Sequence, residues 1–318
     1  MNDIVEIAEP FLIPAYPVVA IGNFDGVHLG HQAILKTTIA RAKEKNGTAV
    51  ALTFWPHPSK VLFPDRETSF LTSSEEKKEM ILSLGVDTVL FVEFNKDFAM
   101  QTPEQFVRNL LVEKIGCKEV IVGKEFLFGK GRLGNVVGLS DLGQQLNFMV
   151  SPQEPVFLED TLVSSSAIRN LLLDGNVSLA AKMLSRPYVL EGEVVYGDGA
   201  GVGLGVATAN MNLPDRIIPK EGIYAARVTL SDAGHAAPYD SVVYVGSKPT
   251  FHENGEIKIE AHLFDYDKKL YGEKIKVAFI EWIRPDKKFH SAAALMQQMK
   301  VDILMARTIL GGTAACEE

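Results

Sequence analysis

The sequence of 318 residues has only two cysteines, Cys117 and Cys316. Two cysteines are too few for a disulfide framework, and their scarcity is typical of a reducing compartment. No stretch reaches the roughly 18 consecutive apolar residues that a membrane-spanning helix needs. The N-terminus shows no basic segment followed by an apolar one, so we expect no secretory signal. These absences predict a cytoplasmic protein that does not interact with membranes.

Positive charge is also scarce, because 32 Lys and Arg stand against 40 Asp and Glu, a formal net charge of −8. Proteins that follow a nucleic-acid backbone neutralise its phosphates with Lys and Arg, so we expect no nucleic-acid partner. The remaining composition, 47% hydrophobic and 23% charged, is that of an ordinary globular protein. At about 100–200 residues per domain, the length predicts two domains.

The first half of the chain alternates apolar runs with helical patterns. Ser73 and Thr102 each stand three residues before a Glu or Gln, as in a capping box at a helix start. This alternation predicts a parallel sheet covered by helices. The expected strands are residues 17–21, 48–54, 87–92 and 120–122, and the expected helices include residues 32–45 and 74–84.

The second half is rich in strand patterns, which predict a small antiparallel barrel. We place the domain boundary near Ser185, giving domains of residues 1–185 and 186–318. Two short helices precede the boundary, and an amphipathic helix ends the barrel domain. The helices are residues 165–173, 177–184 and 292–310, and the strands are residues 189–196, 223–230, 242–245, 257–264 and 275–282.

Residues 22–31, between the first strand and the first helix, read GNFDGVHLGH. Ligands bind open α/β sheets at the carboxyl ends of strands, where a helix N-terminus offers free amides to phosphate. His28 and His31 share one face if both lie in the first helical turn, and there their rings are suited to bind the phosphates of ATP. A surface helix pair and a metal site are the alternatives for such a pair.

Three further segments have chemistry that suits phosphate transfer. Residues 163–169, VSSSAIR, place serines at a helix start and an Arg that can fork onto phosphate, although simple capping is the alternative. Residues 196–205, YGDGAGVGLG, carry five alternating glycines, typical of a nest of amides or of a flexible hairpin. Residues 257–264 alternate apolar and polar side chains, so Glu260 lies on the polar face of a strand, where solvent exposure is its simplest explanation.

These segments together resemble the bacterial bifunctional riboflavin kinase/FMN adenylyltransferases. GNFDGVHLGH is similar to that family's nucleotide-site motif, and TFWPHP, residues 53–58, is similar to its next loop. SSSAIR is similar to its Ser-Ser-Thr-x-Ile-Arg motif, with Ser166 replacing Thr. GKEFLFG, residues 123–129, is similar to its Gly-x-Asp-Phe-x-Phe-Gly loop, with Glu125 replacing Asp.

The second domain shows the same resemblance with three departures, one of which is Val202, near a position where the family often has Arg. Thr208 and Asn210 match the family's Gly-Phe-Pro-Thr-Ala-Asn segment, whereas Val206 and Ala207 replace Phe and Pro. The resemblance implies an α/β Rossmann-like nucleotidyltransferase domain with a parallel sheet. A small antiparallel β-barrel riboflavin kinase domain with a C-terminal helix follows it.

The resemblance also implies the activities: ATP phosphorylates riboflavin to FMN, and a second ATP adenylylates FMN to FAD with release of pyrophosphate. Mg²⁺ is the implied metal, small molecules are the only partners, and the protein is a monomer or a weak homo-oligomer. The implied catalytic residues are His28, His31, Arg169 and Glu260, and the implied metal ligands are Thr208 and Asn210. The implied ATP and phosphate ligands are Gly22, Asn23, Phe24, Asp25, Gly26, Gly30, Ser164, Ser165, Ser166, Gly199, Gly201, Gly205 and Asn210. The implied flavin-site residues are His57, Pro58, Glu125, Phe126, Phe128, Arg284 and Phe289.

Three alternatives remain open. The first is that one half of the enzyme has lost its activity. Of the two, loss of the kinase half is favoured, because that half carries Val206 and Ala207. The second is that the chain is a flavin-binding regulator without catalytic turnover. The intact site motifs argue against this alternative. The third is an adenylyltransferase that acts on another small acceptor, which the second domain disfavours.

Overall fold

A computed structural model describes residues 15–65, 69–195, 209–212, 215–230, 237–247, 257–266, 268 and 270–313. The chain divides into two compact units, Met1–Ser165 and Ser166–Glu318. The units divide earlier in the chain than the boundary predicted near Ser185, because α8 (Val177–Leu184) contacts strands of the second unit. Where the two activities divide stays a prediction.

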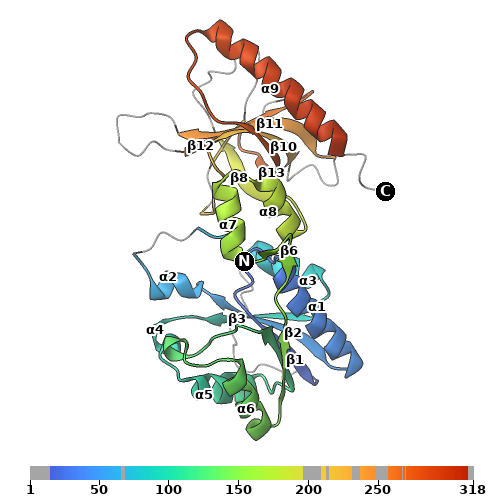
Figure 1. Ribbon diagram of the computed structural model, residues 1–318, viewed down its shortest axis with the longest axis vertical. Helices are drawn as coiled ribbons and strands as arrows, with labels where there is room; N and C mark the ends of the chain where they lie inside the picture. Colours follow the sequence, from blue (N-terminus) through green and yellow to red (C-terminus); the bar gives the residue numbers. More distant parts are fainter. Residues whose placement is uncertain are drawn as a thin grey trace. The chain divides into compact units, whose positions relative to one another are not determined.

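The first unit is built on a five-stranded sheet in which every pair of neighbouring strands is parallel. The strand order is β3-β2-β1-β4-β5, so the first strand of the chain lies at the centre (Figure 1). The predicted parallel sheet is confirmed, and only its last strand was not expected. The strands are β1 (Pro17–Ile21), β2 (Thr48–Trp55), β3 (Thr88–Glu93), β4 (Glu119–Gly123) and β5 (Met149–Gln153).

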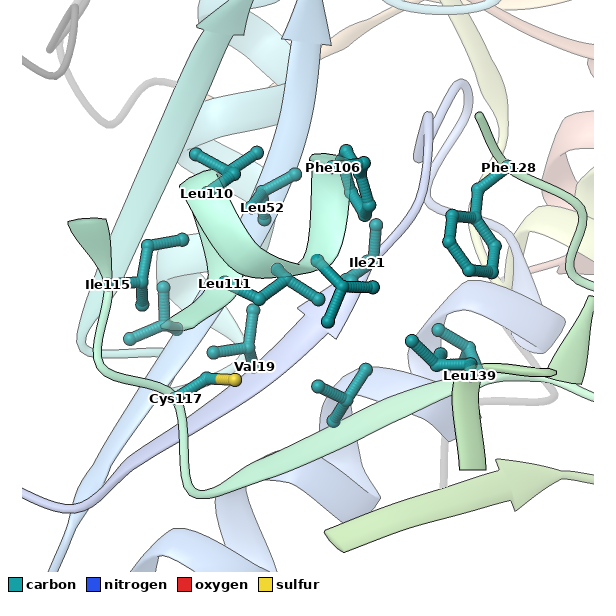
Figure 2. Packing of buried hydrophobic residues seen from close by; sticks show 14 of the residues in the cluster. Val19, Ile21, Leu52, Phe106, Leu110, Leu111, Ile115, Cys117, Phe128 and Leu139 are labelled. Atoms are coloured by element: carbon teal, nitrogen blue, oxygen red, sulfur yellow. The ribbon is translucent and has the colours of Figure 1, made fainter. Parts of the chain in front are cut away.

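Helices cover both faces of this sheet, so β1 is apolar at every position. Val18 and Ala20 pack among buried residues of α1 (Leu29–Glu44) and α3 (Ser74–Ser83). Val19 and Ile21 point to the opposite face, where Leu111 of the π-helix η1 (Phe106–Lys114) and Leu139 of α6 (Val136–Leu146) complete a second core (Figure 2). The alternation follows from the two-residue period of a strand.

Both predicted capping boxes are present. Ser73 and Glu76 exchange side chain–backbone hydrogen bonds of 3.1 and 2.7 Å at the start of α3. Thr102 does the same with Gln105 at the start of α5. The shorter elements of the first unit are α2 (Pro58–Leu62), α4 (Lys96–Ala99), α5 (Pro103–Gln105), the 3₁₀ turn Lys130–Arg132 and the hairpin of β6 (Phe157–Leu158) and β7 (Thr161–Leu162).

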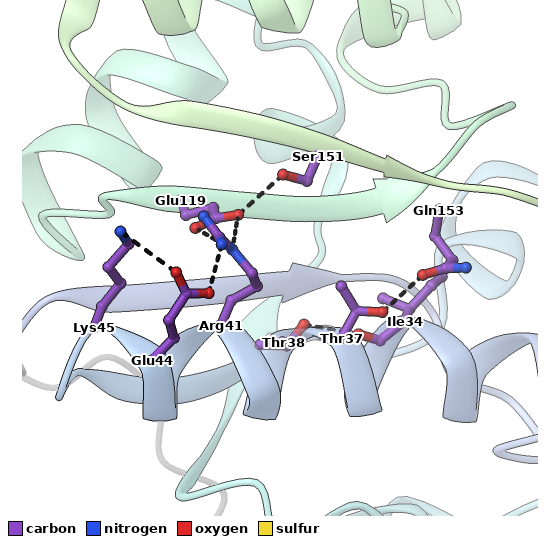
Figure 3. Close-up of polar contacts among 9 residues, drawn as sticks. All are labelled: Ile34, Thr37, Thr38, Arg41, Glu44, Lys45, Glu119, Ser151 and Gln153. Atoms are coloured by element: carbon purple, nitrogen blue, oxygen red, sulfur yellow. Dashed lines mark hydrogen bonds and ion pairs between the residues drawn. The ribbon is translucent and has the colours of Figure 1, made fainter.

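Polar contacts join α1 to the neighbouring strands β4 and β5 (Figure 3). The Glu119 carboxylate is fully buried and accepts hydrogen bonds from Arg41 Nε at 2.9 Å and from the Ser151 hydroxyl at 2.9 Å. The Thr37 hydroxyl donates to Gln153 at 2.8 Å. These contacts join one helix to two neighbouring strands.

The second unit contains the predicted antiparallel barrel, closed in the order β10-β11-β12-β9-β8-β13. The helix α9 (Ala292–Thr313) lies against β10, β11 and β13, where Ala306 and Leu310 are buried. α7 (Ser165–Leu173) and α8 precede the barrel at the predicted positions. The barrel strands are β8 (Tyr188–Val195), β9 (Ala209–Met211), β10 (Gly222–Leu230), β11 (Tyr239–Ser247), β12 (Ile257–Leu263) and β13 (Lys274–Arg284).

Among the helices of the described ranges, none has the length and apolar character that crossing a membrane requires.

The carboxylates of Glu119 and Glu44 share one partner, Arg41, but differ in burial, and this difference predicts their contributions to stability. Glu44 pairs with Arg41 at 2.7 Å and is more than half exposed, so Glu44→Ala should change the free energy of unfolding by at most about 1 kcal/mol. Glu119→Ala removes a buried, charge-assisted network and should cost about 2–3 kcal/mol.

Denaturant unfolding measures both losses. The chain has two tryptophans, so a Trp282→Phe background leaves Trp55 as a fluorescence reporter of the first unit. Equal losses from the two alanine variants would contradict the assignment of the stabilisation to the buried carboxylate.

Candidate functional site

Segments predicted to bind nucleotide and flavin follow the carboxyl ends of adjacent strands. Residues 22–28 follow β1, residues 56–57 follow β2 and residues 124–129 follow β4. Since β1 pairs in parallel with both β2 and β4, the three segments leave the sheet at one edge. This edge is where open α/β sheets bind ligands.

The nucleotide loop, residues 22–28, has a strained backbone. Phe24, Gly26 and Val27 have positive φ angles of 50°, 85° and 41°. Such angles are uncommon for Phe and costly for a β-branched residue. The side chains of Phe24 and Val27 are buried in the core beneath α1, so packing of the first unit maintains their positive φ angles.

Asp25 attaches the nucleotide loop to the segment before α3. Its carboxylate is 4% exposed and accepts hydrogen bonds from the backbone N–H groups of Leu71 at 3.0 Å and Thr72 at 3.1 Å. The Gly26 N–H in turn donates to the Thr72 hydroxyl at 3.0 Å. The carboxylate therefore orders the loop, and its predicted contact with ATP stays a prediction.

His28 and His31 lie on one face, as their spacing predicts. Their ring centroids are 3.6 Å apart with an interplanar angle of 20°, and the buried His28 Nδ1 accepts from the His31 backbone N–H at 3.4 Å. Burial, followed by the neighbouring His28 and Lys77, holds the pKa of His31 well below 6.5. His31 is therefore neutral at physiological pH in the free protein.

Gly30 leaves room for this ring stack. A Cβ at position 30 would lie 3.1 Å from Cε1 and 3.2 Å from Nδ1 of His28, closer than nearly all ordinary contacts. Any side chain there displaces the His28 ring or the turn that carries it.

Lys77 is a residue of this site that the motifs do not include. Its side chain, on α3, is 6% exposed, and Nζ donates to the Asn23 carbonyl at 3.0 Å and to the Thr53 hydroxyl at 3.2 Å. Burial lowers its pKa from 10.5 to about 8. A signal was present in the sequence, because Lys77 shares a helical period with Ile81 and Leu84, which places it on the buried face.

The segment after β2 is ordered by a short helix. His57 is the N-cap of α2, with Nδ1 accepting from the Ser59 N–H at 3.2 Å, and Pro58 is the first helical residue. The His57 ring lies 4.9 Å from that of Phe70. Both predicted flavin-site residues are partly buried.

The segment after β4 places its three predicted flavin-site residues differently. Glu125 is exposed, and Phe126 is partly buried. Phe128 is 7% exposed, stacks on Phe126 at 5.4 Å and packs on Phe106 at 5.5 Å. Phe128 thus belongs to the core that supports the loop.

The serine motif begins α7, where Ser164 and Ser165 are half-buried and Ser166 is exposed. The Ser165 hydroxyl donates to the Asp25 carbonyl at 2.9 Å, which joins the motif to the nucleotide loop. Arg169 lies one helical turn further along and belongs, with Ser166, to the second unit.

In the barrel, Glu260 lies on β12 between Asn210 of β9 and Tyr244 of β11, which are its cross-strand partners. Residues paired in this way present their side chains on one face. Burial and the nearby carboxylates of Asp286, Glu221 and Glu260 raise the pKa of Tyr244 to about 12. Tyr244 has no place in the matched motifs and is found only through strand register.

Four further predicted residues of the barrel site lie outside the described residues: Gly199, Gly201, Gly205 and Thr208.

Arg284 holds α9 to the barrel. Its guanidinium forms a two-pronged ion pair with Asp302, at 2.9 and 2.7 Å, and Asp302 is 2% exposed. Arg284 also lies over the Phe289 ring, 6.0 Å from its centroid. Both predicted flavin-site residues are thus packed together at the junction of β13 and α9.

Within the described ranges, no group of three or more His, Cys, Asp or Glu side chains is arranged to hold a metal ion.

Comparison with known proteins agrees with this arrangement. A family model described as FAD synthetase matches residues 13–167, and one described as riboflavin kinase matches residues 184–310. A solved structure described as a macrolide-efflux protein from Streptococcus pneumoniae has a TM-score of 0.86 and 28% identity, over 94% of this chain and 96% of that chain.

Curated relatives extend over nearly the whole chain. The bifunctional riboflavin kinase/FMN adenylyltransferase of Bacillus subtilis is 36% identical over 91% of this chain and 90% of its own length. The Escherichia coli K12 protein of the same name is 34% identical over 93% of both chains. The chain therefore belongs to the bifunctional riboflavin kinase/FMN adenylyltransferase family.

Proposed function

We propose that this chain is a transferase that makes FAD from riboflavin in two ATP-consuming steps. Riboflavin and ATP give FMN and ADP, and FMN with a second ATP gives FAD and pyrophosphate. The observation that carries the proposal is that both matched regions occur in one chain, residues 13–167 for FAD synthesis and residues 184–310 for the kinase. We assign the adenylyl transfer to residues 1–185 and the phosphorylation to residues 186–318.

In adenylyl transfer, a phosphate oxygen of FMN attacks the α-phosphorus of ATP and pyrophosphate leaves. This chemistry needs positioned donors for the charge on the phosphates and no covalent intermediate. The neutral ring of His31 and its stacked partner His28 supply N–H donors at the start of α1. Backbone amides of the nucleotide loop, including those of Gly22 and Gly30, add further donors. Arg169 and the serines of the motif are the remaining phosphate ligands in this assignment.

In the kinase reaction, the Glu260 carboxylate accepts the proton of the riboflavin hydroxyl that attacks the γ-phosphorus of ATP. Asn210, next to Glu260 in register, has an amide oxygen suited to Mg²⁺, and Thr208 has a hydroxyl of the same kind. A bound Mg²⁺ neutralises triphosphate charge in both reactions. Arg284 fixes the position of Phe289 at the flavin end of this site through its ion pair with α9, and Phe128 supports the loop that carries Glu125 and Phe126.

Both reactions consume ATP and use only small molecules, so we propose a cytoplasmic protein without a nucleic-acid partner, as a monomer or weak homo-oligomer. Loss of the kinase half has no support, since the riboflavin kinase match covers the barrel and most of α9.

A chromatographic product assay tests the function. The purified chain is incubated with Mg²⁺ and ATP, with riboflavin in one tube and FMN in another. We expect FAD in both tubes and FMN as an intermediate in the first. FAD from FMN alone would mean that the barrel has lost kinase activity, and no product from either tube would contradict both assignments.

Single substitutions should separate the two activities. His31→Ala removes a phosphate donor and should lower FAD formation from FMN by about 10²–10³-fold while FMN formation continues. Glu260→Gln should stop FMN formation and leave FAD formation from supplied FMN unchanged. Initial rates with each flavin measure both effects, and a folded variant that loses both activities would refute the separate sites.

Gly30→Ala should lower FAD formation about tenfold, because its Cβ displaces the His28 ring and small displacements of catalytic groups are costly. Gly138→Ala on α6 is the matched control, since the nearest atom to its Cβ lies at an ordinary 3.7 Å. The comparison uses initial rates with FMN, and equal rates for the two variants would show that the ring stack tolerates a side chain at position 30.

A further inference from the structure

The nucleotide loop is supported from behind by a small polar cluster around Lys77. The Thr53 hydroxyl donates to the Asn23 carbonyl at 3.1 Å, so this carbonyl accepts from both Thr53 and Lys77. Thr53 is fully buried, and the Lys77 ammonium lies 5.5 Å from the centroid of the Phe91 ring. A carbonyl at the entrance of the loop is thus turned towards the protein interior, where two donors bind it.

We propose that Lys77 is a positioning residue for adenylyl transfer: from beneath the nucleotide loop it holds the strained backbone that presents His28 and His31. The proposal rests on the function proposed above for the first unit. Positive φ angles at Phe24 and Val27 persist only where surrounding contacts enforce them. Lys77 binds the loop one residue before Phe24, and Asp25 anchors it one residue after.

The charge of Lys77 has a second effect, on the histidine pair. Two stacked imidazoles cannot both become positively charged imidazoliums without strong repulsion, and a nearby ammonium disfavours even the first such charge. Lys77 is one of the groups that lower the pKa of His31, after burial and His28. A fixed positive charge therefore stands under the phosphate site, while His31 stays neutral and the stack stays intact.

Burying a lysine is costly, and its placement here is consistent with function. Burial disfavours the ammonium, and the Asp25 carboxylate offsets this only in part, so the pKa of Lys77 stands at about 8. Because this pKa is below that of an unfolded lysine, 10.5, the buried charge opposes folding at neutral pH, and the opposition fades as pH rises through the range between the two values. A lysine that stabilised the fold through its charge would have a pKa above 10.5 instead of below it.

The test compares Lys77→Met with Lys77→Gln, which keeps a donor for the Asn23 carbonyl but has no charge. We expect Lys77→Met to lower the rate of FAD formation from FMN by about 10²-fold. The pH profile of kcat/KM, which reports groups of the free enzyme, should lose its basic limb near pH 8 in both variants. Its acidic limb should move to higher pH, because the His31 pKa rises. Lys78→Met, on the same helix, is the control and should change neither activity.

A second readout does not depend on activity. Histidine NMR titration, with the His31 signal identified by its loss in His31→Ala, should show a higher His31 pKa in both charge-removing variants. If Lys77→Met is misfolded, Lys77→Gln and the wild-type pH profile still test the positioning role of Lys77. The proposal is overturned if a folded variant keeps FAD formation within about twofold and leaves the pH profile and the His31 pKa unchanged. A wild-type chain that makes no FAD would instead refute the proposed function, and the titration would still test the coupling.

Discussion

The nucleotide edge of the first unit depends on the hydrogen bonds that the buried Asp25 carboxylate accepts from the backbone of Leu71 and Thr72. The loop has energetically unfavourable backbone φ angles, and these bonds connect it to the segment that leads into α3. The N-terminus of α3 is itself stabilised by a capping box. The same loop carries His28, which stacks on His31, and its Asp25 carbonyl accepts a hydrogen bond from Ser165. The position of the stacked histidines thus depends on a buried carboxylate that binds the protein's own backbone.

Much of this arrangement could be predicted from the sequence because it depends on local patterns. Apolar runs of strand length, helix starts with Ser73 or Thr102, and the strand–loop–helix setting of His28 are all readable within a few residues. The period of residues 257–264 placed Glu260 on a polar strand face, and the barrel confirms the alternation. The catalytic assignments came from the family resemblance, since an isolated Glu on a strand has no chemistry of its own.

The remaining features depend on contacts between residues far apart in the sequence. Lys77 bonds to Asn23 and Thr53, neither of which is near it along the chain. Tyr244 reaches Glu260 through strand register, which depends on the whole barrel. Arg284 pairs with Asp302 because α9 folds back over β13, and no local pattern indicates that the single acidic residue of that helix meets this arginine. Tertiary contacts of this kind decide whether a polar residue serves the core or the ligand.

The position of β1 at the centre of the sheet has a consequence for the order of assembly. The chain adds β2 and β3 on one side of β1 before β4 and β5 exist to cover the other. During synthesis, which releases the N-terminal part first, residues 17–93 can form a three-stranded layer with α1 and α3 on one face. The segment that clamps Asp25 belongs to this layer, so the nucleotide loop can take shape while the ribosome is still making the rest of the unit. The opposite face, with its apolar Val19 and Ile21, stays open until η1 and α6 emerge, and during this interval the nascent chain exposes an apolar surface that is prone to aggregation.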